Sequence, residues 1–263
     1  MAIADELRWT VVTGASSGIG AELARVFAAR GYPLVLTARR HERLEALAHE
    51  IRQAHGVPVE IMALDLEDRE APQDLAEMLR ERGIAVHTLV NNAGFGLRGY
   101  FASLPHEKQL AMIDLNVTAL TSLSRLMLPG MIERRRGGIL NVASTAAFQA
   151  GPYMAVYYAT KAFVLSLSEA LHDEAKPHGV TVTALCPGPT ESEFSDTAGL
   201  KDSRLFKAGA MSSAEVARIG IEGYEAGRAI VVPGAKNRVG TIGAKLMPRF
   251  LSRRIAGLLQ GIK

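Results

Sequence analysis

The stretch Thr13-Gly14-Ala15-Ser16-Ser17-Gly18-Ile19-Gly20 decides the fold class of this chain. It follows an apolar run at residues 8–13, which we expect to be a strand, and it opens an amphipathic segment at 19–30, which we expect to be a helix. Glycines at such a junction permit a tight turn and let backbone N–H groups approach a pyrophosphate at the helix N-terminus. The spacing G-x-x-x-G-x-G departs from the common G-x-G-x-x-G pattern, so a purely structural turn also fits.

The rest of the chain repeats this strand-then-helix alternation. Further strands are expected at residues 33–38, 59–64, 88–91, 138–143, 181–186 and 229–232, and helices at 42–54, 71–82, 107–134, 155–176 and 213–226. The alternation predicts an α/β, Rossmann-like doubly wound parallel sheet of about seven strands flanked by helices. We expect a single catalytic domain over residues 1–235 with a substrate flap at 189–211, followed by a basic amphipathic tail at 236–263.

Composition narrows the class of protein. The chain has 263 residues, of which 48% are hydrophobic, as in a globular domain. Its one cysteine, Cys186, excludes an internal disulfide, and the scattered histidines lack metal-ligand spacing, so no metal site is expected. The first residues do not resemble a secretory leader and no apolar run reaches about 18 residues, so we expect a soluble cytoplasmic protein.

The net charge of +3 conceals an asymmetry along the sequence. No acidic residue follows Glu225, whereas eight lysines and arginines do. The first 225 residues therefore carry a net charge of about −5. Because the basic character belongs to the tail, no nucleic-acid partner is expected.

Charge at the end of the second expected strand bears on the cofactor. Dinucleotide sites that bind NAD usually place a carboxylate about 20 residues beyond the glycine turn, to bind the ribose 2′-hydroxyl. Here the strand ends in Arg39 and Arg40. Two guanidiniums suit a 2′-phosphate, which predicts a preference for NADP(H). Both arginines would also fit the solvated start of a helix.

The glycine turn contains a rival motif. Residues 14–18 match G-x-S-x-G, the nucleophile elbow of α/β hydrolases, with Ser16 as the nucleophile. A hydrolase also needs an acidic residue and then a histidine at later strand ends. His172 and His178 fall within or just after an expected helix, which disfavours a serine hydrolase.

Two adjacent tyrosines stand one helical turn before a lysine. Tyr157 lies four residues and Tyr158 three residues ahead of Lys161, so both can share its helix face. The ordinary pKa of a tyrosine is near 10, and a nearby ammonium group lowers it by stabilising the phenolate. We therefore expect a phenol that exchanges protons, although the spacing alone does not say which of the two it is.

These motifs occur together in an order that resembles the short-chain dehydrogenase/reductase family. The glycine turn is followed by Asn91-Asn-Ala-Gly94, Asn116, Ser144, Tyr157-x-x-x-Lys161 and Pro187-Gly188. The resemblance covers residues 8–232. It implies a nicotinamide cofactor and catalysis by Asn116, Ser144, Tyr157 and Lys161. The family's tyrosine stands thirteen residues after its serine, and Tyr157 has that spacing from Ser144.

The resemblance also assigns roles. Tyr157 would exchange a proton with a carbonyl or alcohol oxygen, Ser144 would hydrogen-bond that oxygen, and Lys161 would bind the nicotinamide ribose. Asn116 would hold a water that relays protons from the lysine. Further cofactor contacts would come from Gly14, Ser16, Ser17, Gly18, Ile19, Gly20, Arg39, Arg40, Asp65, Leu66, Asn92, Ala93, Gly94, Pro187, Gly188 and Thr190. Family members often carry threonine at the position of Ser192, so the contact to the carboxamide is less defined here.

The substrate is constrained only by the expected pocket walls. They lie at residues 95–97, 146–153 and 191–211 and include Phe148, Tyr153, Phe194, Leu200, Leu205, Phe206 and Met211, which favours an apolar small-molecule carbonyl or secondary alcohol. Alternatives remain: a catalytically silent NADP(H)-binding regulator, or an epimerase, whose usual larger C-terminal domain is missing.

The C-terminal tail has the pattern of a basic amphipathic helix. Residues 239–260 place apolar and basic side chains at helical spacing, with Pro248 starting or kinking a helix. Such a segment can lie on a membrane surface, or pack on its own domain or a partner subunit. The resemblance suggests a homodimer or homotetramer built through the helices at 107–134 and 155–176.

Overall fold

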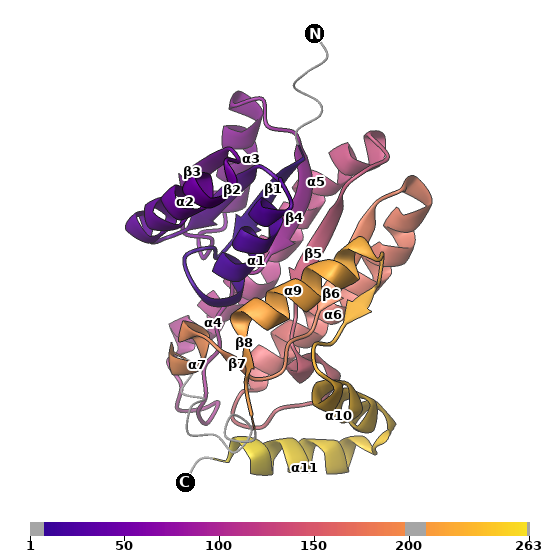
Figure 1. The fold of residues 1–263 in the computed structure, drawn as a ribbon. Helices are drawn as coiled ribbons and strands as arrows, with labels where there is room; N and C mark the ends of the chain where they lie inside the picture. The colour runs from indigo at the N-terminus through magenta and orange to yellow at the C-terminus, as the bar shows by residue number, and fades with distance from the viewer. Residues whose placement is uncertain (1–7, 198–208, 262–263) are drawn as a thin grey trace.

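A seven-stranded parallel sheet forms the centre of the computed structural model, which describes residues 8–197 and 209–261 (Figure 1). The strands follow the order β3-β2-β1-β4-β5-β6-β9. The strand bounds are β1 (Trp9–Thr13), β2 (Leu34–Ala38), β3 (Val59–Ala63), β4 (Val86–Asn91), β5 (Gly138–Val142), β6 (Thr181–Leu185) and β9 (Ile230–Val231). Each expected strand is present, with ends shifted by at most two residues. The Rossmann-like, doubly wound sheet predicted from the alternation is confirmed.

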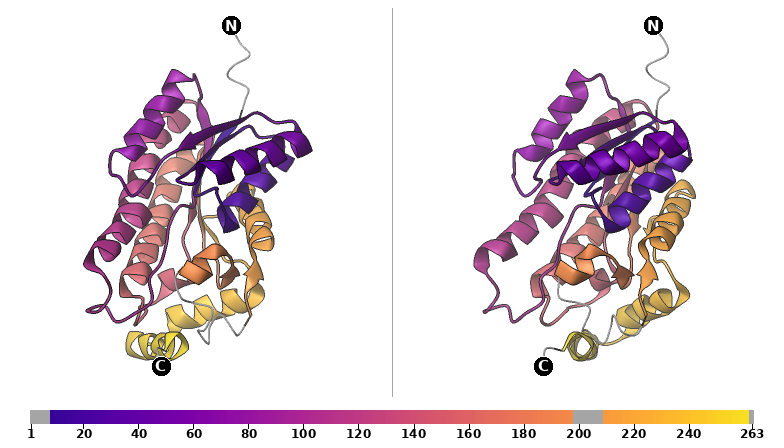
Figure 2. Two further views of the ribbon diagram at one scale, coloured as in Figure 1. Left: turned by 90° about the vertical axis from the view of Figure 1, so that its left-hand side faces the viewer. Right: turned by 60° about the vertical axis from the view of Figure 1, so that its left-hand side comes forward.

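Helices cover both faces of the sheet (Figure 2). One layer contains α1 (Gly18–Ala29), α2 (His41–His55) and α9 (Ser213–Glu225). The other contains α3 (Ala71–Glu81), α4 (His106–Ile113), α5 (Leu120–Glu133) and α6 (Ala155–Ala175), which is followed by the short turn η3 (Lys176–His178). Two apolar cores result, one on each side of the sheet, centred on Phe27 and Leu36 in the first layer and on Leu75 and Leu123 in the second. Buried strands with apolar residues on both faces are typical of such sheets.

The long helix expected at residues 107–134 has an irregular centre. Between α4 and α5 the chain forms a π-helical segment, η1 (Asp114–Ala119), without leaving the helical path. Such wide turns inside helices are rare and occur frequently at functional sites. Asn116 lies within this segment and is buried.

The point where the strand order reverses lies between β1 and β4. β1 pairs with β2 on one side and with β4 on the other, so the chain crosses from one half of the sheet to the other there. Ligands bind beyond the carboxyl ends of strands at such a point. Thr13 fastens the two strands at this edge, since its hydroxyl accepts hydrogen bonds from the backbone N–H groups of Asn92 (2.9 Å) and Ala93 (3.0 Å).

Beyond this carboxyl edge lie the flap and the C-terminal helices (Figure 1). The described part of the flap contains β7 (Thr190–Glu191) and α7 (Glu193–Thr197), and β7 pairs with β8 (Met211–Ser212). Leu200, Leu205 and Phe206, three of the expected pocket walls, lie outside the described residues. The tail forms α10 (Ala235–Leu246) and α11 (Arg249–Gln260), and Pro248 precedes the start of α11 as expected. No helix among the described residues is long and apolar enough to cross a bilayer.

Candidate active site

The glycine turn forms an open cradle at the start of α1. Gly14 and Gly18 adopt positive φ angles of 65° and 55°, which side chains other than glycine rarely tolerate. A Cβ atom on Gly20 would collide with the carbonyl oxygen of Gly14 and the side-chain amide of Asn92. Ser17 is the N-cap of α1 but makes no side-chain capping bond, so the helix N-terminus keeps backbone donors for an anionic ligand. The turn therefore fits a pyrophosphate.

Arg40 joins the glycine turn to the flap. Its guanidinium donates hydrogen bonds to the hydroxyls of Ser16 (3.0 Å) and Ser17 (3.0 Å) and forms an ion pair with Glu193 of α7 (2.8 Å). Arg43 binds the other oxygen of the same carboxylate at 2.8 Å. The hydrogen bond from Arg40 holds the pKa of Glu193 below its usual value. Two arginines thus already hold an anionic group beside the turn, which fits the 2′-phosphate of NADP(H).

Arg39 points to a different set of partners. It pairs with Glu67 at 2.8 Å and lies 3.7 Å from a carboxylate oxygen of Asp65. Leu66, beside Asp65, is buried in the core. Arg39 and Asp65 are therefore neighbours on the adenosine side of the expected cofactor path, although the sequence separates them by 26 positions.

The loop after β4 forms the floor of the site. Asn92 donates from its side-chain amide to the backbone oxygen of Thr13 at 2.9 Å and also reaches the Gly14 carbonyl. Gly94 lies against the catalytic candidates, because a Cβ there would lie 2.8 Å from Asn116 Oδ1 and 3.7 Å from Lys161 Nζ. A side chain at this position would therefore displace Asn116.

Tyr157 and Ser144 meet at the carboxyl end of β5. Ser144 follows this strand and caps the 3₁₀ turn η2 (Thr145–Phe148), where its Oγ accepts a hydrogen bond from the Ala146 N–H at 3.1 Å. The Ser144 side chain lies close enough to the Tyr157 hydroxyl to lower the pKa of the phenol. Tyr158, the other candidate, turns instead toward the tail and accepts a hydrogen bond from Gln260 at 2.9 Å. Of the two tyrosines, Tyr157 faces the serine.

Lys161 lies under Tyr157 with its amine buried. Nζ donates to the backbone oxygen of Val142 at 2.7 Å and lies 5.9 Å from the centre of the Tyr157 ring. Burial lowers the pKa of Lys161 from 10.5 to about 8, because the charged amine has lost its water. The amine therefore gives up a proton more readily than an exposed lysine.

The expectation that Lys161 lowers the pKa of the phenol is wrong for the chain by itself. Burial raises the pKa of Tyr157 well above its usual value of 10, and the Ser144 side chain offsets only part of this effect. Loss of hydration penalises the phenolate more than the surrounding groups stabilise it. The hydroxyl therefore remains protonated at neutral pH.

Asn116 bridges the loop after β4 and the catalytic helix. Its Oδ1 accepts from the Phe95 N–H at 3.1 Å, while Nδ2 donates to the Phe95 carbonyl at 3.0 Å and to the Thr160 hydroxyl at 3.1 Å. The π-helical segment lets the side chain lie between α6 and the loop. Thr160 was not expected to take part, because a threonine next to a lysine carries no sequence signal.

The nicotinamide-side residues lie between the flap and α10. Gly188 packs against the Asn237 side chain, which a Cβ on Gly188 would overlap. Thr190 is buried and donates to the Gly188 carbonyl at 3.0 Å. Ser192 lies over the glycine turn, 3.0 Å from the position of a Cβ on Gly18. The beginning of the flap thus crosses the expected cofactor path. Glu193 belongs to this crossing, and no sequence pattern connects it with arginines about 150 positions earlier.

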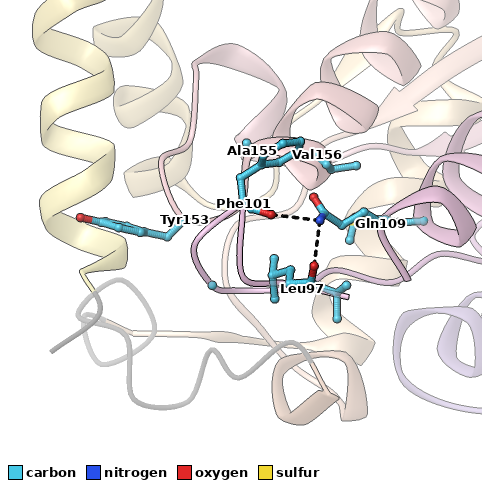
Figure 3. Close-up of a pocket in the computed structure, with 9 residues that line it drawn as sticks. Leu97, Phe101, Gln109, Tyr153, Ala155 and Val156 are labelled. Carbon is cyan, nitrogen blue, oxygen red and sulfur yellow. Dashed lines mark hydrogen bonds between the residues drawn. The ribbon is translucent and has the colours of Figure 1, made fainter. Parts of the chain in front are cut away.

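Apolar side chains surround the Tyr157 ring. Phe194 of the flap lies 5.5 Å from it, measured between ring centres, and Phe95, Leu97 and Met154 belong to the same cluster. A small pocket lies nearby, between the loop after β4 and the start of α6, as Figure 3 shows. There the Gln109 amide donates to the Phe101 carbonyl at 3.1 Å, and Tyr153 and Val156 form other parts of the wall. The loops around Tyr157 are therefore mostly apolar.

Comparison with known proteins identifies the family of the chain. The sequence profile of the short chain dehydrogenase family matches residues 8–202. The chain is 34% identical to a short-chain dehydrogenase from Sphingobium yanoikuyae in complex with NADPH, with a TM-score of 0.81 over 98% of this chain and 97% of that one. A 7β-hydroxysteroid dehydrogenase structure has a TM-score of 0.86 at 25% identity, covering 98% and 100%.

Curated relatives show the same class of protein. A sulfoacetaldehyde reductase from Chromohalobacter salexigens is 43% identical over 70% of this chain and 72% of its own length. A very-long-chain 3-oxoacyl-CoA reductase from Anas platyrhynchos is 37% identical over 68% of this chain, and the match spans 58% of that protein. The fold and the family profile place the chain in a class of Rossmann-type oxidoreductases, and its glycine turn fits a dinucleotide cofactor. The chain belongs to the short-chain dehydrogenase/reductase family.

Proposed function

We propose that this chain is an NADP(H)-dependent oxidoreductase that interconverts a carbonyl and a secondary alcohol of an apolar substrate, with Tyr157 as the proton donor and acceptor. The observation that carries the proposal is the buried Tyr157 at the carboxyl edge of the sheet, with Ser144 beside its hydroxyl and Lys161 Nζ 5.9 Å from its ring centre.

The reaction follows from the positions of these groups. NADPH, when bound, supplies the hydride. Tyr157 donates its proton to the substrate oxygen, and its raised pKa keeps that proton available at neutral pH. Ser144 hydrogen-bonds the same oxygen and stabilises the charge that develops on it. Lys161 binds the ribose hydroxyls, and Asn116 is proposed to orient a water between the lysine and solvent.

The surroundings of Arg40 support the preference for NADP(H). Arg40, Arg43 and the two serines of the glycine turn provide donors at one place, and two of these donors already bind a carboxylate. The NADPH named with the Sphingobium relative is in line with this proposal. Titration should give a lower dissociation constant for NADPH than for NADH, and equal affinities would contradict it.

An apolar substrate is supported by the ring of Phe194 and its neighbours. Phe95, Leu97 and Met154 belong to the same apolar cluster as Tyr157. The relatives act, by their names, on a 3-oxoacyl-CoA, a sulfoacetaldehyde and a steroid, so the family alone does not identify the substrate.

Turnover tests this proposal. NADPH oxidation should be measured with a panel of aldehydes, ketones, 3-oxoacyl thioesters, steroids and sugars. Tyr157→Phe should abolish turnover and leave NADPH binding nearly unchanged, whereas Tyr158→Phe should keep turnover and serves as the matched control. A Tyr157→Phe enzyme that retains turnover would refute the assigned proton donor. Binding without turnover on any substrate would favour a silent NADP(H)-binding regulator.

The hydrogen bonds of Ser16 disfavour the hydrolase alternative. Its hydroxyl accepts hydrogen bonds from Arg40 at 3.3 and 3.0 Å, and none of its hydrogen bonds within the described residues involves a histidine. A guanidinium cannot accept the proton of a nucleophilic serine. Ser16 is better suited to bind phosphate.

We also propose that the chain forms a homodimer or homotetramer through α4, α5 and α6. Leu110 and Ile113 on α4 and Phe163 on α6 are exposed on these helices. Light scattering coupled to size-exclusion chromatography would test this, and a monomeric mass would contradict it.

A further inference from the structure

α11 is oriented with its apolar side toward solvent. Its buried residues, Ser252, Ala256 and Gln260, recur every four positions and are small or polar. Leu251, Ile255 and Leu258 form a second stripe that is exposed, with Leu258 68% accessible. A surface helix of a globular protein normally buries its apolar stripe and exposes its polar one. This arrangement is reversed.

Specific hydrogen bonds fix that orientation. The Gln260 side chain donates to the Tyr158 hydroxyl at 2.9 Å, and its backbone oxygen accepts two bonds from Arg98, at 2.9 and 2.6 Å. Ser252 donates to Gln149 at 3.3 Å. A rotation of α11 that buried the leucines would break these contacts. The outward position of the apolar stripe is therefore determined by the structure.

α10 also exposes apolar side chains. Val239, Ile242 and Leu246 share one helix face at spacings of three and four residues, and Leu246 is 82% accessible. We call the exposed apolar residues of α10 and α11 the tail face: Val239, Ile242, Leu246, Phe250, Leu251, Ile255 and Leu258. Soluble monomeric proteins rarely expose contiguous apolar surface of this kind unless it binds something.

Charge identifies what the tail face can bind. Arg249, Arg253 and Arg254 project from α11, and within the described residues none of them forms an ion pair. No acidic residue follows Glu225 in the sequence. A second copy docked by two-fold symmetry would set cations against cations, which is unfavourable. An anionic lipid surface provides both hydrocarbon for the leucines and negative charge for the arginines.

We propose that the tail face binds an anionic lipid surface, with α10 and α11 lying in the plane of the interface. The two helices lie beyond the carboxyl edge of the sheet in all views (Figures 1 and 2), so this attachment turns the candidate active site toward the bilayer. An apolar carbonyl dissolved in the membrane would then be close to the site. The lipid binding itself does not depend on the proposed reaction, because it needs no turnover.

Flotation of the full chain with liposomes tests the proposal. The protein should float with vesicles of phosphatidylglycerol and phosphatidylcholine and remain at the bottom with phosphatidylcholine alone. Arg253→Gln combined with Arg254→Gln should lower the lipid partition coefficient about twenty-five-fold, at about fivefold per cation. Leu251→Ser combined with Leu258→Ser should lower it at least about tenfold, since the lost contacts are with hydrocarbon. Raised salt should weaken binding of the wild type.

A matched control separates the tail face from net charge. Arg125→Gln combined with Lys176→Gln removes the same charge from α5 and η3, and should leave flotation unchanged. Circular dichroism checks that each variant is folded. Absence of wild-type flotation with anionic vesicles would overturn the proposal. So would equal losses in the control and the arginine pair. If the leucine pair instead lowers the mass in light scattering while the wild type fails to float, the tail face binds a second copy and the lipid proposal is wrong.

Discussion

Replacing Lys161 by methionine should change how the stability of the folded chain depends on pH. In the folded chain burial lowers the pKa of this lysine to about 8, whereas in the unfolded chain it should have its ordinary value of 10.5. Between these two values the unfolded chain binds one more proton than the folded chain at this side chain. The free energy of unfolding therefore rises with pH over this range, and Lys161 stabilises the fold least at neutral pH.

The size of the effect follows from the two pKa values. The difference between 10.5 and about 8 corresponds to about 3 kcal/mol against folding at neutral pH, when the amine is charged in both states. Raising the pH from about 7 to about 9 should remove about 1.3 kcal/mol of this penalty. Methionine has a similar length and no charge, so the variant lacks this contribution. It also loses the hydrogen bond to Val142, which shifts stability equally at both pH values.

Urea denaturation of the cofactor-free chain measures this prediction. The free energy of unfolding of wild type minus that of Lys161→Met should increase by about 1.3 kcal/mol between about pH 7 and about pH 9. Taking the difference cancels the titration of all other groups. Lys176→Met, at an exposed lysine of η3, is the control and should show no such increase. Parallel curves for wild type and Lys161→Met would refute the argument that the amine is buried and easily deprotonated.

Three further predictions concern the cofactor site. Arg40→Gln should weaken NADPH binding about tenfold or more, because charge-assisted hydrogen bonds are lost, and should change NADH binding much less. Fluorescence titration measures both affinities. Equal losses for the two cofactors would count against the 2′-phosphate contact. Gly20→Ala should destabilise the fold by about 1–3 kcal/mol, because the added methyl group meets the Gly14 carbonyl. Gly240→Ala is the control: no atom lies within 4 Å of the added methyl group, so the change should be neutral or stabilising in the same denaturation assay. A serine-directed phosphonate should leave Ser16 unlabelled by mass spectrometry, and labelling would revive the hydrolase alternative.

The parallel sheet and its flanking helices could be predicted because each local signal agreed with the fold. Alternating apolar runs and amphipathic segments, each bounded by glycine or polar residues, leave few topologies for a parallel sheet. The irregular segment η1 could not be predicted, since residues 107–134 read as one continuous helix. Its wide turn is stabilised by tertiary contacts of Asn116 with Phe95 and Thr160, which periodicity does not reveal.

The site could be predicted where spacing within one element decides a contact, and not where distant elements meet. Tyr157 and Lys161 lie one turn apart on α6, so their proximity followed from helix geometry. The bridge from Arg40 and Arg43 to Glu193 joins elements about 150 positions apart, and opposite charge alone selects no partner among the many carboxylates of the chain. The outward orientation of α11 could not be predicted either, because helical spacing shows that apolar residues share one face but not whether that face is buried or exposed.

Burial at the carboxyl edge raises the pKa of Tyr157 and lowers that of Lys161, which suits proton donation during reduction. In the proposed reaction Tyr157 gives its proton away, and the phenolate left behind is a strong base because burial raises its pKa. Lys161, with a pKa of about 8, is the better acid of the pair and lies beneath the same ring. Proton transfer from the lysine toward the phenolate would therefore be downhill. The reverse reaction must first remove a proton from a phenol that burial makes less acidic. In the oxidation direction, the positive charge of the oxidised nicotinamide would act against this effect by stabilising the phenolate.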